Sequence, residues 1–119
     1  MNSVETGIDW HQVPLDCLGA WSAVFRSSQE TLNLSSPCAL CGVPKLHRWY
    51  LVGQPIDSSF GGTHYVARGA LWEWCSACGA FVHYSASVPD WWSCGLVVDM
   101  SQVKITPESI EQARRMAER

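Results

Sequence analysis

The feature that most constrains the fold of this 119-residue chain is a repeated motif, Cys-x-x-Cys-Gly, which begins at Cys38 and again at Cys75. Two cysteines at this spacing can bind one metal ion from a tight turn, and the glycine that follows permits the left-handed backbone of that turn. The two copies supply four sulfur ligands, Cys38, Cys41, Cys75 and Cys78. Four ligands complete a tetrahedral Zn²⁺ site and leave no open position, so we predict one structural zinc ion.

The composition is typical of a small globular protein. Hydrophobic residues make up 47% and charged residues 16% of the chain, and no segment reaches the roughly 18 to 20 apolar residues of a membrane helix. Residues 1–12 do not resemble a secretory signal, which has a basic and then an apolar region. We therefore expect a single domain, residues 1–119, in the reducing cytoplasm. There the six cysteines are expected as metal ligands and free thiols rather than as disulfides.

The charge balance argues against nucleic acid as a partner. Eleven Asp and Glu outnumber eight Lys and Arg, and a four-thiolate zinc site adds about two further negative charges. The best clusters of basic residues are two small groups, Lys45, His47 and Arg48, and Arg114, Arg115 and Arg119. Binding to phosphate backbones uses larger clusters of Lys and Arg than these.

Two helices are predicted, one toward each end of the chain. The first covers residues 14–27, because Pro14 suits a first helical position and apolar residues recur at helical spacing after it. The stripe consists of Leu15, Leu18, Trp21, Val24 and Phe25. The second helix covers residues 107–118, with Thr106 as its N-cap and Pro107 at its first position.

Strands are predicted between the helices, in segments rich in aromatic and β-branched residues. They cover residues 46–52, 64–74 and 80–87, with shorter pieces at 32–34, 96–100 and 103–105. The second Cys-x-x-Cys-Gly motif is expected to join two of them as an antiparallel hairpin. Residues 54–63, rich in Ser and Gly, are expected to form an exposed loop. The predicted class is α+β, with a central antiparallel sheet and a helix before and after it.

The two Cys-x-x-Cys-Gly motifs resemble those of zinc ribbons, a superfamily of four-cysteine modules. The resemblance covers residues 36–86 and implies a zinc-ribbon-like sheet around one Zn²⁺ ion. Zinc ribbons bind DNA, RNA or protein, or only stabilise a larger fold, so the resemblance is specific for the metal and not for a function.

The whole chain is similar in general character to immunity proteins of bacterial polymorphic toxin systems, which neutralise a cognate toxin by covering it. The similarity rests on the small size, the acidic charge, the seven tryptophans and the helices on either side of a central sheet, not on a motif. It implies a protein partner, specifically a toxin domain with a basic surface.

Catalysis is not expected. The Pro-Cys-x-x-Cys segment at the first motif matches half of the zinc deaminase signature, in which the metal activates a water molecule. The other half is an upstream His-x-Glu, but His11 is followed by Gln12 and Val13. The general acid is therefore missing, and the second motif closes the metal shell, so the chain is predicted not to be an enzyme.

Four residues keep more than one interpretation. His47 and His83 follow the two motifs at similar offsets, so each is either a group at the metal site or an ordinary strand histidine. Cys17 and Cys94 have no Cys-x-x-Cys partner. A buried free thiol is the favoured interpretation for Cys17, whereas that of Cys94 stays open.

Most of the tryptophans are expected in the core, with Trp49 meeting Trp72 and Trp74 on one face of the sheet. Trp91 and Trp92 differ, because two adjacent rings do not easily both point inward. Either one of them is exposed to a partner, or both pack against the zinc hairpin. Since an acidic surface complements a basic partner, the predicted partner contacts are Asp57, Glu73, Asp90, Trp91, Trp92 and Asp99.

Two functions are compatible with these features. The first is a non-catalytic, zinc-stabilised protein-binding module, most specifically an immunity protein. The alternative is a nucleic-acid-binding zinc-ribbon regulator that uses Lys45, Arg48 and Arg68. The charge balance favours the first, and the oligomeric state stays open.

Overall fold

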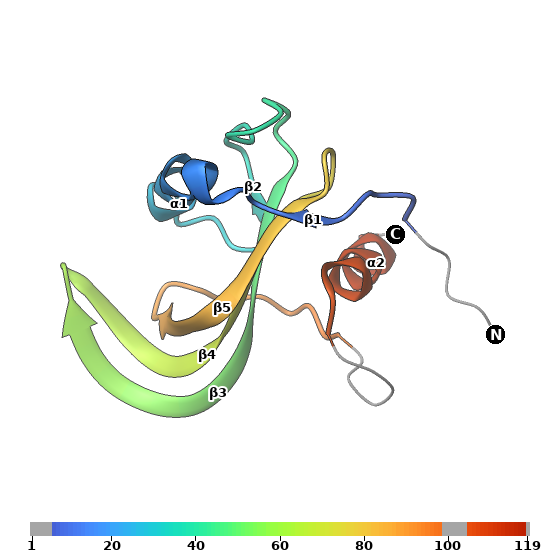
Figure 1. Cartoon of the computed structure of the whole chain (residues 1–119). Helices are drawn as coiled ribbons and strands as arrows, with labels where there is room; N and C mark the ends of the chain where they lie inside the picture. The colour runs from blue at the N-terminus through green and yellow to red at the C-terminus, as the bar shows by residue number, and fades with distance from the viewer. Residues whose placement is uncertain (1–5, 99–104, 119) are drawn as a thin grey trace.

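The central feature of the fold is a curled sheet of five strands with one helix packed on each face (Figure 1). The computed structural model describes residues 6–98 and 105–118. In chain order the elements are β1 (His11–Gln12), the 3-10 helix η1 (Leu15–Cys17), α1 (Leu18–Arg26), β2 (Asn33–Leu34), β3 (Leu46–Phe60), β4 (Thr63–Cys75), β5 (Ala80–Pro89) and α2 (Pro107–Ala117). The predicted α+β class is confirmed.

The strands follow the order β1-β5-β4-β3-β2 across the sheet. β3, β4 and β5 form an antiparallel meander, and β2 pairs antiparallel with the start of β3. At the other edge, β1 runs parallel to β5. The N–H groups of His11 and Val13 donate to the carbonyls of Gly79 and Phe81, each over 3.0 Å. The predicted antiparallel zinc-ribbon-like sheet is therefore wrong, because the N-terminal segment adds a parallel strand to a strongly curled sheet.

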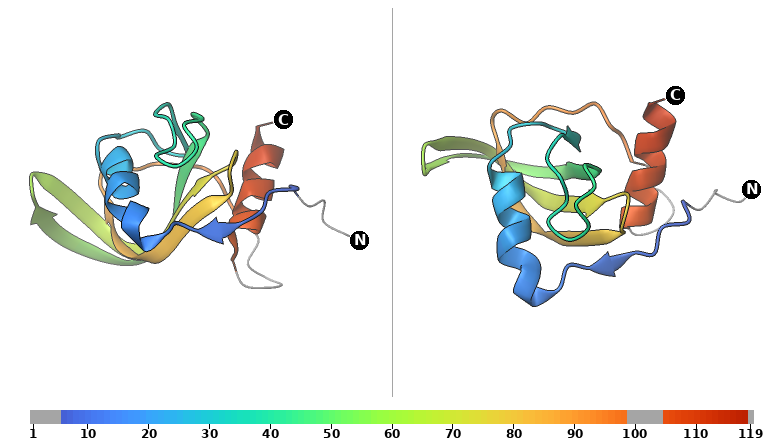
Figure 2. Two further views of the ribbon diagram at one scale, coloured as in Figure 1. Left: turned by 45° about the horizontal axis from the view of Figure 1, so that its top comes forward. Right: turned by 90° about the horizontal axis from the view of Figure 1, so that it is seen from above.

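The strands β3 and β4 form a long hairpin that reaches past the end of β5 (Figures 1 and 2). Residues 54–63 belong to this hairpin and not to the predicted loop, since backbone pairing continues as far as Phe60 and Thr63. Gly61 and Gly62 between them have φ angles of +58° and +82°, as a two-residue type I′ turn requires. The polar composition hid the strand, whereas the Gly-Gly pair is the signal that would have found it.

The other predicted strands have mixed outcomes. β4 and β5 cover the expected 64–74 and 80–87, the second motif forms the turn between them, and β2 lies within 32–34. Residues 96–98 form no strand. Most of the rest of the expected 96–100 and 103–105 lies outside the described residues.

The helix α1 packs on one face of the sheet through Trp21 and Phe25, which are both almost fully buried. Leu15, predicted to belong to the same apolar stripe, is 87% exposed. Residues 15–17 form the 3-10 helix η1, and its three residues per turn put Leu15 out of phase with the α-helix that follows. The buried stripe is therefore shorter than the sequence predicted.

The helix α2 packs on the opposite face, so that the sheet lies between the two helices (Figure 2). Trp49, Trp72 and Trp74 form one cluster there with Ile110 of α2, which confirms that the three rings meet. The Trp74 indole N–H donates to the fully buried carboxylate of Glu111 over 2.8 Å. The predicted N-cap of α2 is also present, since the hydroxyl of Thr106 accepts a hydrogen bond from a backbone N–H of the first turn.

Arg48 is a structural residue and not part of a nucleic-acid surface. Its side chain is only 3% exposed. The guanidinium donates to the carbonyl of Phe25 at 3.0 Å, and its second nitrogen donates to those of Ser28 at 3.0 Å and Glu30 at 2.6 Å. These acceptors lie at and after the end of α1, where helix carbonyls have no partner within the helix. The predicted role of Arg48 in binding nucleic acid is therefore wrong.

Replacing Arg48 by lysine is expected to lower the free energy of unfolding by about 2–3 kcal/mol, because one ammonium group cannot reproduce the fork that satisfies three backbone carbonyls, two of them buried. Urea denaturation of the metal-loaded protein measures the change. The matched control is Arg68→Lys, since Arg68 is exposed and makes one hydrogen bond, to Ser87. That variant is expected to change stability by less than about 0.5 kcal/mol, and equal effects of the two substitutions would contradict the assigned role.

Candidate metal centre

The two Cys-x-x-Cys-Gly motifs lie side by side at one end of the sheet. The first forms the loop that leads into β3, and the second forms the turn between β4 and β5. Strand pairing brings them together, because Leu46 at the start of β3 lies opposite Cys75 at the end of β4. The Ser76 N–H also donates to the Lys45 carbonyl at 2.9 Å. Strand pairing and this hydrogen bond therefore hold the two motifs next to each other.

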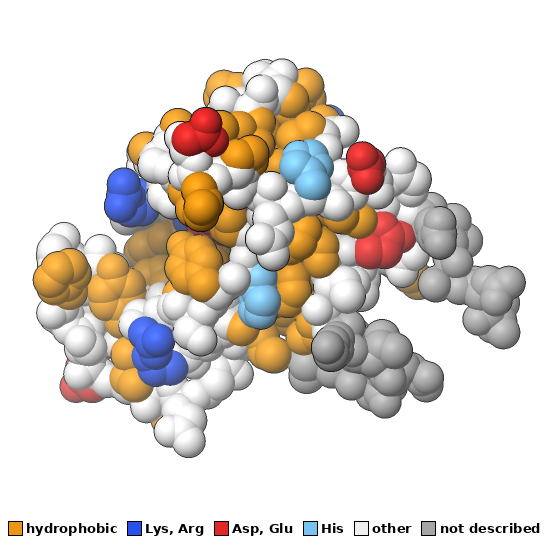
Figure 3. Space-filling model, viewed as in Figure 1, with side chains coloured by type: hydrophobic (Ala, Val, Ile, Leu, Met, Phe, Trp, Pro, Cys, Tyr) orange, Lys and Arg blue, Asp and Glu red, His pale blue; other side chains and the backbone are white. Residues whose placement is uncertain are grey.

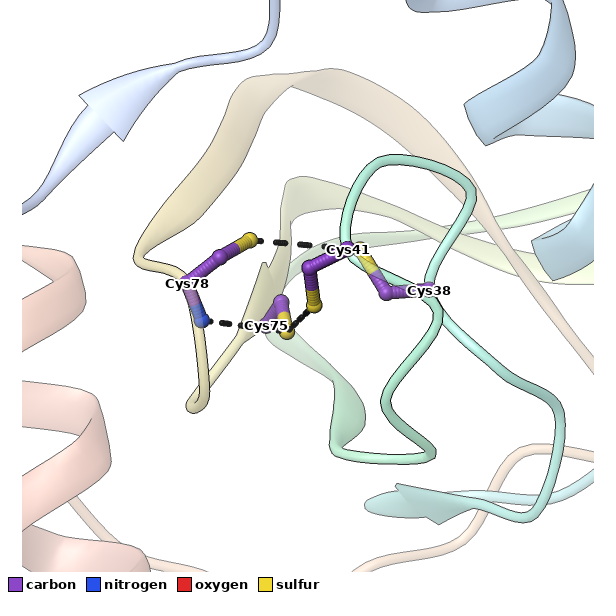
Figure 4. A group of neighbouring side chains, drawn as sticks. All are labelled: Cys38, Cys41, Cys75 and Cys78. Carbon is purple, nitrogen blue, oxygen red and sulfur yellow. Dashed lines mark hydrogen bonds between the residues drawn. The ribbon is translucent and has the colours of Figure 1, made fainter.

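The four cysteine sulfurs lie close together in one group (Figure 4). Sγ of Cys38 lies 3.9 Å from Sγ of Cys78, Sγ of Cys41 lies 3.7 Å from Sγ of Cys75, and all four atoms lie within 4.8 Å of one another. A tetrahedral Zn²⁺ ion with bonds of about 2.3 Å to sulfur requires sulfur–sulfur distances of about 3.8 Å. The group is thus compatible with one metal ion.

The two motifs share one backbone conformation. In each, the glycine N–H donates over 2.9 Å to the carbonyl of the first cysteine, from Gly42 to Cys38 and from Gly79 to Cys75. The glycines have φ angles of +79° and +85°, a region in which other residues are strained. This equivalence explains why a glycine follows both pairs.

Backbone N–H groups also point at the sulfurs. The Leu40 N–H donates to Sγ of Cys38 over 3.3 Å, and the Cys78 N–H donates to Sγ of Cys75 over 3.5 Å. The backbone N–H groups of Val43, Ala77 and Ala80 act to lower the pKa of Cys41, Cys75 and Cys78, respectively, in the same way. Hydrogen bonds of this kind favour the thiolate over the thiol. The backbone of both turns is therefore arranged to support negatively charged sulfur.

The thiol pKa values of the metal-free protein differ across the group. Burial raises the pKa of Cys75 and of Cys78. Burial also acts on Cys41 in the same direction, but hydrogen bonds, led by that from the Val43 N–H, outweigh it and lower the pKa. A metal ion that binds the cysteines as thiolates must therefore displace protons from at least Cys75 and Cys78 at neutral pH.

The two histidines that follow the motifs lie outside the four-sulfur group. His47 is buried between Ser76 and Asn33, with each ring nitrogen 2.8 Å from a side-chain oxygen. Burial, reinforced by the charge of Arg114, lowers the pKa of His47 to about 4. His83 stacks on Trp72 instead. His47 thus braces the second motif through Ser76, and His83 lies farther along the same face of the sheet, the face on which α2 packs.

Cys17 and Cys94 also lie outside the four-sulfur group, and both are half-buried free thiols. Cys17 ends η1, where its thiol faces Asp16, and burial and that carboxylate raise its pKa. Cys94 packs at the edge of the tryptophan cluster under α2. Neither cysteine therefore competes for the metal position.

Two of the predicted partner contacts come together at the far end of the sheet. His64 near the hairpin turn has Nε2 at 2.7 Å from Asp57 and Nδ1 at 3.6 Å from Asp90. The side chains of Asp57 and Asp90 are 93% and 51% exposed. The hydrogen bond to Asp57, with smaller effects of both carboxylates, raises the pKa of His64. The sequence did not predict a role for His64, because only the register set by the Gly-Gly turn places it beside Asp57.

The other predicted contacts fare differently. Glu73 is 4% exposed and accepts a hydrogen bond from the Trp21 indole, so its predicted role as a surface contact is wrong. Trp91 and Trp92 are both half-buried, with Trp91 under the Arg48 guanidinium and Trp92 edge-on to another ring. Asp99 lies outside the described residues.

Comparisons with protein-family models, curated proteins and solved structures found no match to this chain. Neither helix of the described residues is long and apolar enough to cross a membrane. The metal centre and the exposed surface of the chain itself therefore carry the functional conclusions.

Changing Cys41 to serine is expected to abolish stoichiometric metal binding, because a site of this kind needs all four thiolates. Cys41 is the exposed member of the group, so the change removes a ligand without opening a cavity in the core. Elemental analysis of the purified protein measures the metal and identifies it. Cys94→Ser is the matched control and is expected to keep one metal ion per chain, whereas wild-type protein without stoichiometric metal would refute the site.

Replacing Gly79 by alanine is expected to cost more stability than replacing Gly42. Both positions have positive φ, which penalises alanine by about 1 kcal/mol. A Cβ at Gly79 would also overlap the carbonyl oxygen of Asp9, whereas nothing lies within 4 Å of one at Gly42. Gly79→Ala should therefore displace β1 as well, seen as faster hydrogen exchange of the His11 amide. Equal destabilisation by the two changes, with His11 still protected, would contradict this account.

Proposed function

We propose that this protein is a non-catalytic protein-binding module of the reducing cytoplasm, held together by one structural Zn²⁺ ion. The sulfur–sulfur separations support zinc, and a shell of four protein sulfurs leaves no coordination position for a substrate. The metal would then stabilise the fold, and binding would take place elsewhere on the surface.

The observation that carries the proposal is the composition of the hairpin arm, which we define as residues 55–67 together with Asp90, at the end of the sheet opposite the metal centre. Asp57 and Asp90 flank His64 there with their carboxylates exposed. Phe60, beside the turn, is 79% exposed, and Val66 is also exposed. An exposed aromatic ring in the same arm as exposed carboxylates suits a protein partner with basic residues.

The specific form of the proposal is an immunity protein that neutralises a bacterial toxin by covering its basic surface. This form rests on the general character of the chain: small, acidic and rich in tryptophan. The nucleic-acid-binding alternative loses Arg48 to the core, and Lys45 and Arg68 remain as its exposed basic residues. No observation favours it over a protein partner.

The test measures the affinity for a partner protein, which is first captured by binding to the zinc-loaded protein and is then purified. Charge reversal in Asp57→Lys/Asp90→Lys is expected to weaken binding at least tenfold, whereas Asp9→Lys, at the metal end of the sheet, should have little effect. Because the pKa of His64 is raised, its imidazolium forms as the pH falls and neutralises part of the arm. Binding should therefore weaken from pH 8 to pH 5.5, and His64→Gln should reduce that dependence.

Two results would contradict the proposal. The first is a partner whose affinity is unaffected by charge reversal in the arm. The second is tight binding of RNA or DNA that weakens steeply with salt and survives removal of protein partners, which would favour the nucleic-acid alternative. The immunity form is tested separately, by rescue of cells that express the captured partner as a toxin.

A further inference from the structure

Among the described residues, the outer edge of β5 is open along most of its length. β1 pairs only with Ala80 and Phe81, and at Pro14 the chain turns away into η1. β5 continues to Pro89 and is paired on its other side with β4. Most of β5 therefore has a strand neighbour on one side only.

The hydrogen bonds of β1 show which backbone groups face this edge. The carbonyls of Gly79 and Phe81 accept from β1, and alternate residues of a strand direct their N–H and C=O groups to the same side. After Phe81, the next alternate residues are His83 and Ser85. The alternation holds for them because β5 pairs with β4 without a register shift up to Val88. Both residues thus present an N–H and a C=O outward, without a strand partner in the described part of the chain.

A cavity of about 410 Å³ lies beside this edge. The sheet contributes Trp72 and His83 to its lining. Leu15 of η1 and Leu18 at the start of α1 line one side of it, and Ile105, just before α2, also lines it. None of the residues that line the cavity is Lys, Arg, Asp or Glu. The open edge therefore borders an uncharged, largely apolar groove. On the face of the molecule that Figure 3 shows, hydrophobic side chains gather near the middle.

The side chains at the groove leave the edge accessible. The imidazole of His83 stacks on Trp72, with ring centroids 3.7 Å apart, and its Nδ1 lies 3.2 Å from the Leu71 carbonyl. The ring is thereby held over β4 and does not cover the backbone of β5. Leu15 and Tyr84 at the groove are both exposed, so apolar surface adjoins the unpaired backbone groups.

We propose that the open edge of β5 binds an extended, uncharged peptide segment of a partner protein, which adds a strand beside β5. The N–H and C=O groups of His83 and Ser85 would pair with the peptide backbone, and alternate side chains of the peptide would enter the groove. This surface is distinct from the hairpin arm, so the proposal stands or falls independently of the partner bound there.

The shape and charge of the groove select this occupant. A charged side chain placed in an apolar groove without a counter-charge loses hydration, so an uncharged segment fits best. A second copy of the chain would have to bring a whole sheet edge between the α1 and α2 segments that flank the cavity, and a stable dimer typically buries about 800 Å² on each partner. A single extended chain needs only the width of one strand.

The test uses random dodecapeptides displayed on phage, selected on the zinc-loaded full-length protein. Enriched peptides are expected to lack charge and proline at their centre and to alternate apolar residues. Ser85→Pro removes the outward N–H without breaking a bond to β4, because that N–H is directed to the open edge. It should weaken the synthesised peptides at least tenfold, whereas the matched control Ser85→Ala should change affinity less than about twofold.

Hydrogen exchange locates the bound peptide and covers the case in which Ser85→Pro fails to fold. Bound peptide should slow exchange of the His83 and Ser85 amides at least tenfold and leave those of Val82 and Tyr84, which face β4, unchanged. Leu15→Lys, an exposed change in the groove, should also weaken binding at least tenfold.

Three results would overturn the proposal. The first is that the enriched peptides bind equally well to Ser85→Pro or to Leu15→Lys and protect other amides. The second is protection of His83 and Ser85 that grows with protein concentration in the absence of peptide, which would make a second copy the occupant. The third is protection of both amides in the dilute protein alone, which would show that the chain covers its own edge.

Discussion

The association of four cysteine sulfurs at one end of the sheet is the constraint on which the rest of the structure depends. It joins the loop before β3 to the turn between β4 and β5. The second turn in turn supports the N-terminal segment, because Gly79 lets Asp9 approach and accepts the hydrogen bond that begins β1. β1 leads directly into η1 and α1, so the position of the first helix also follows from the cysteine-bearing turn.

Hydrogen bonds between tryptophan and glutamate attach the helices to the sheet and α2 to the segment before β1. The pairs are Trp21 with Glu73, Trp74 with Glu111 and Trp10 with Glu108. A buried indole N–H needs an acceptor, and in this chain three of the seven use a carboxylate. Part of the acidic composition is thus structural, since Glu73 and Glu111 are buried, as is the basic Arg48. Net charge computed from the sequence is therefore only a partial guide to the charge at the surface.

The two ends of the sheet have different physical character. At the metal end, backbone turns, thiol groups and the N-terminal segment are packed together around the four sulfurs. At the far end the β3–β4 hairpin passes beyond β5, exposing Phe60 and the carboxylates beside His64. The open edge of β5 lies between these ends. The candidate metal site and the exposed arm are therefore far apart on the sheet.

The sequence by itself determined the four-sulfur group, the two flanking helices and the β4–β5 hairpin, because each depends on local spacing: Cys-x-x-Cys-Gly, helical periodicity after Pro14 and Thr106, and β-forming residues around the second motif. Only the tertiary structure decided the parallel β1 and the burial of Arg48 and Glu73. Those outcomes depend on partners far away in the chain. A polar segment becomes a strand when a neighbour pairs with it, and a charged side chain enters the core when distant carbonyl or indole groups satisfy it.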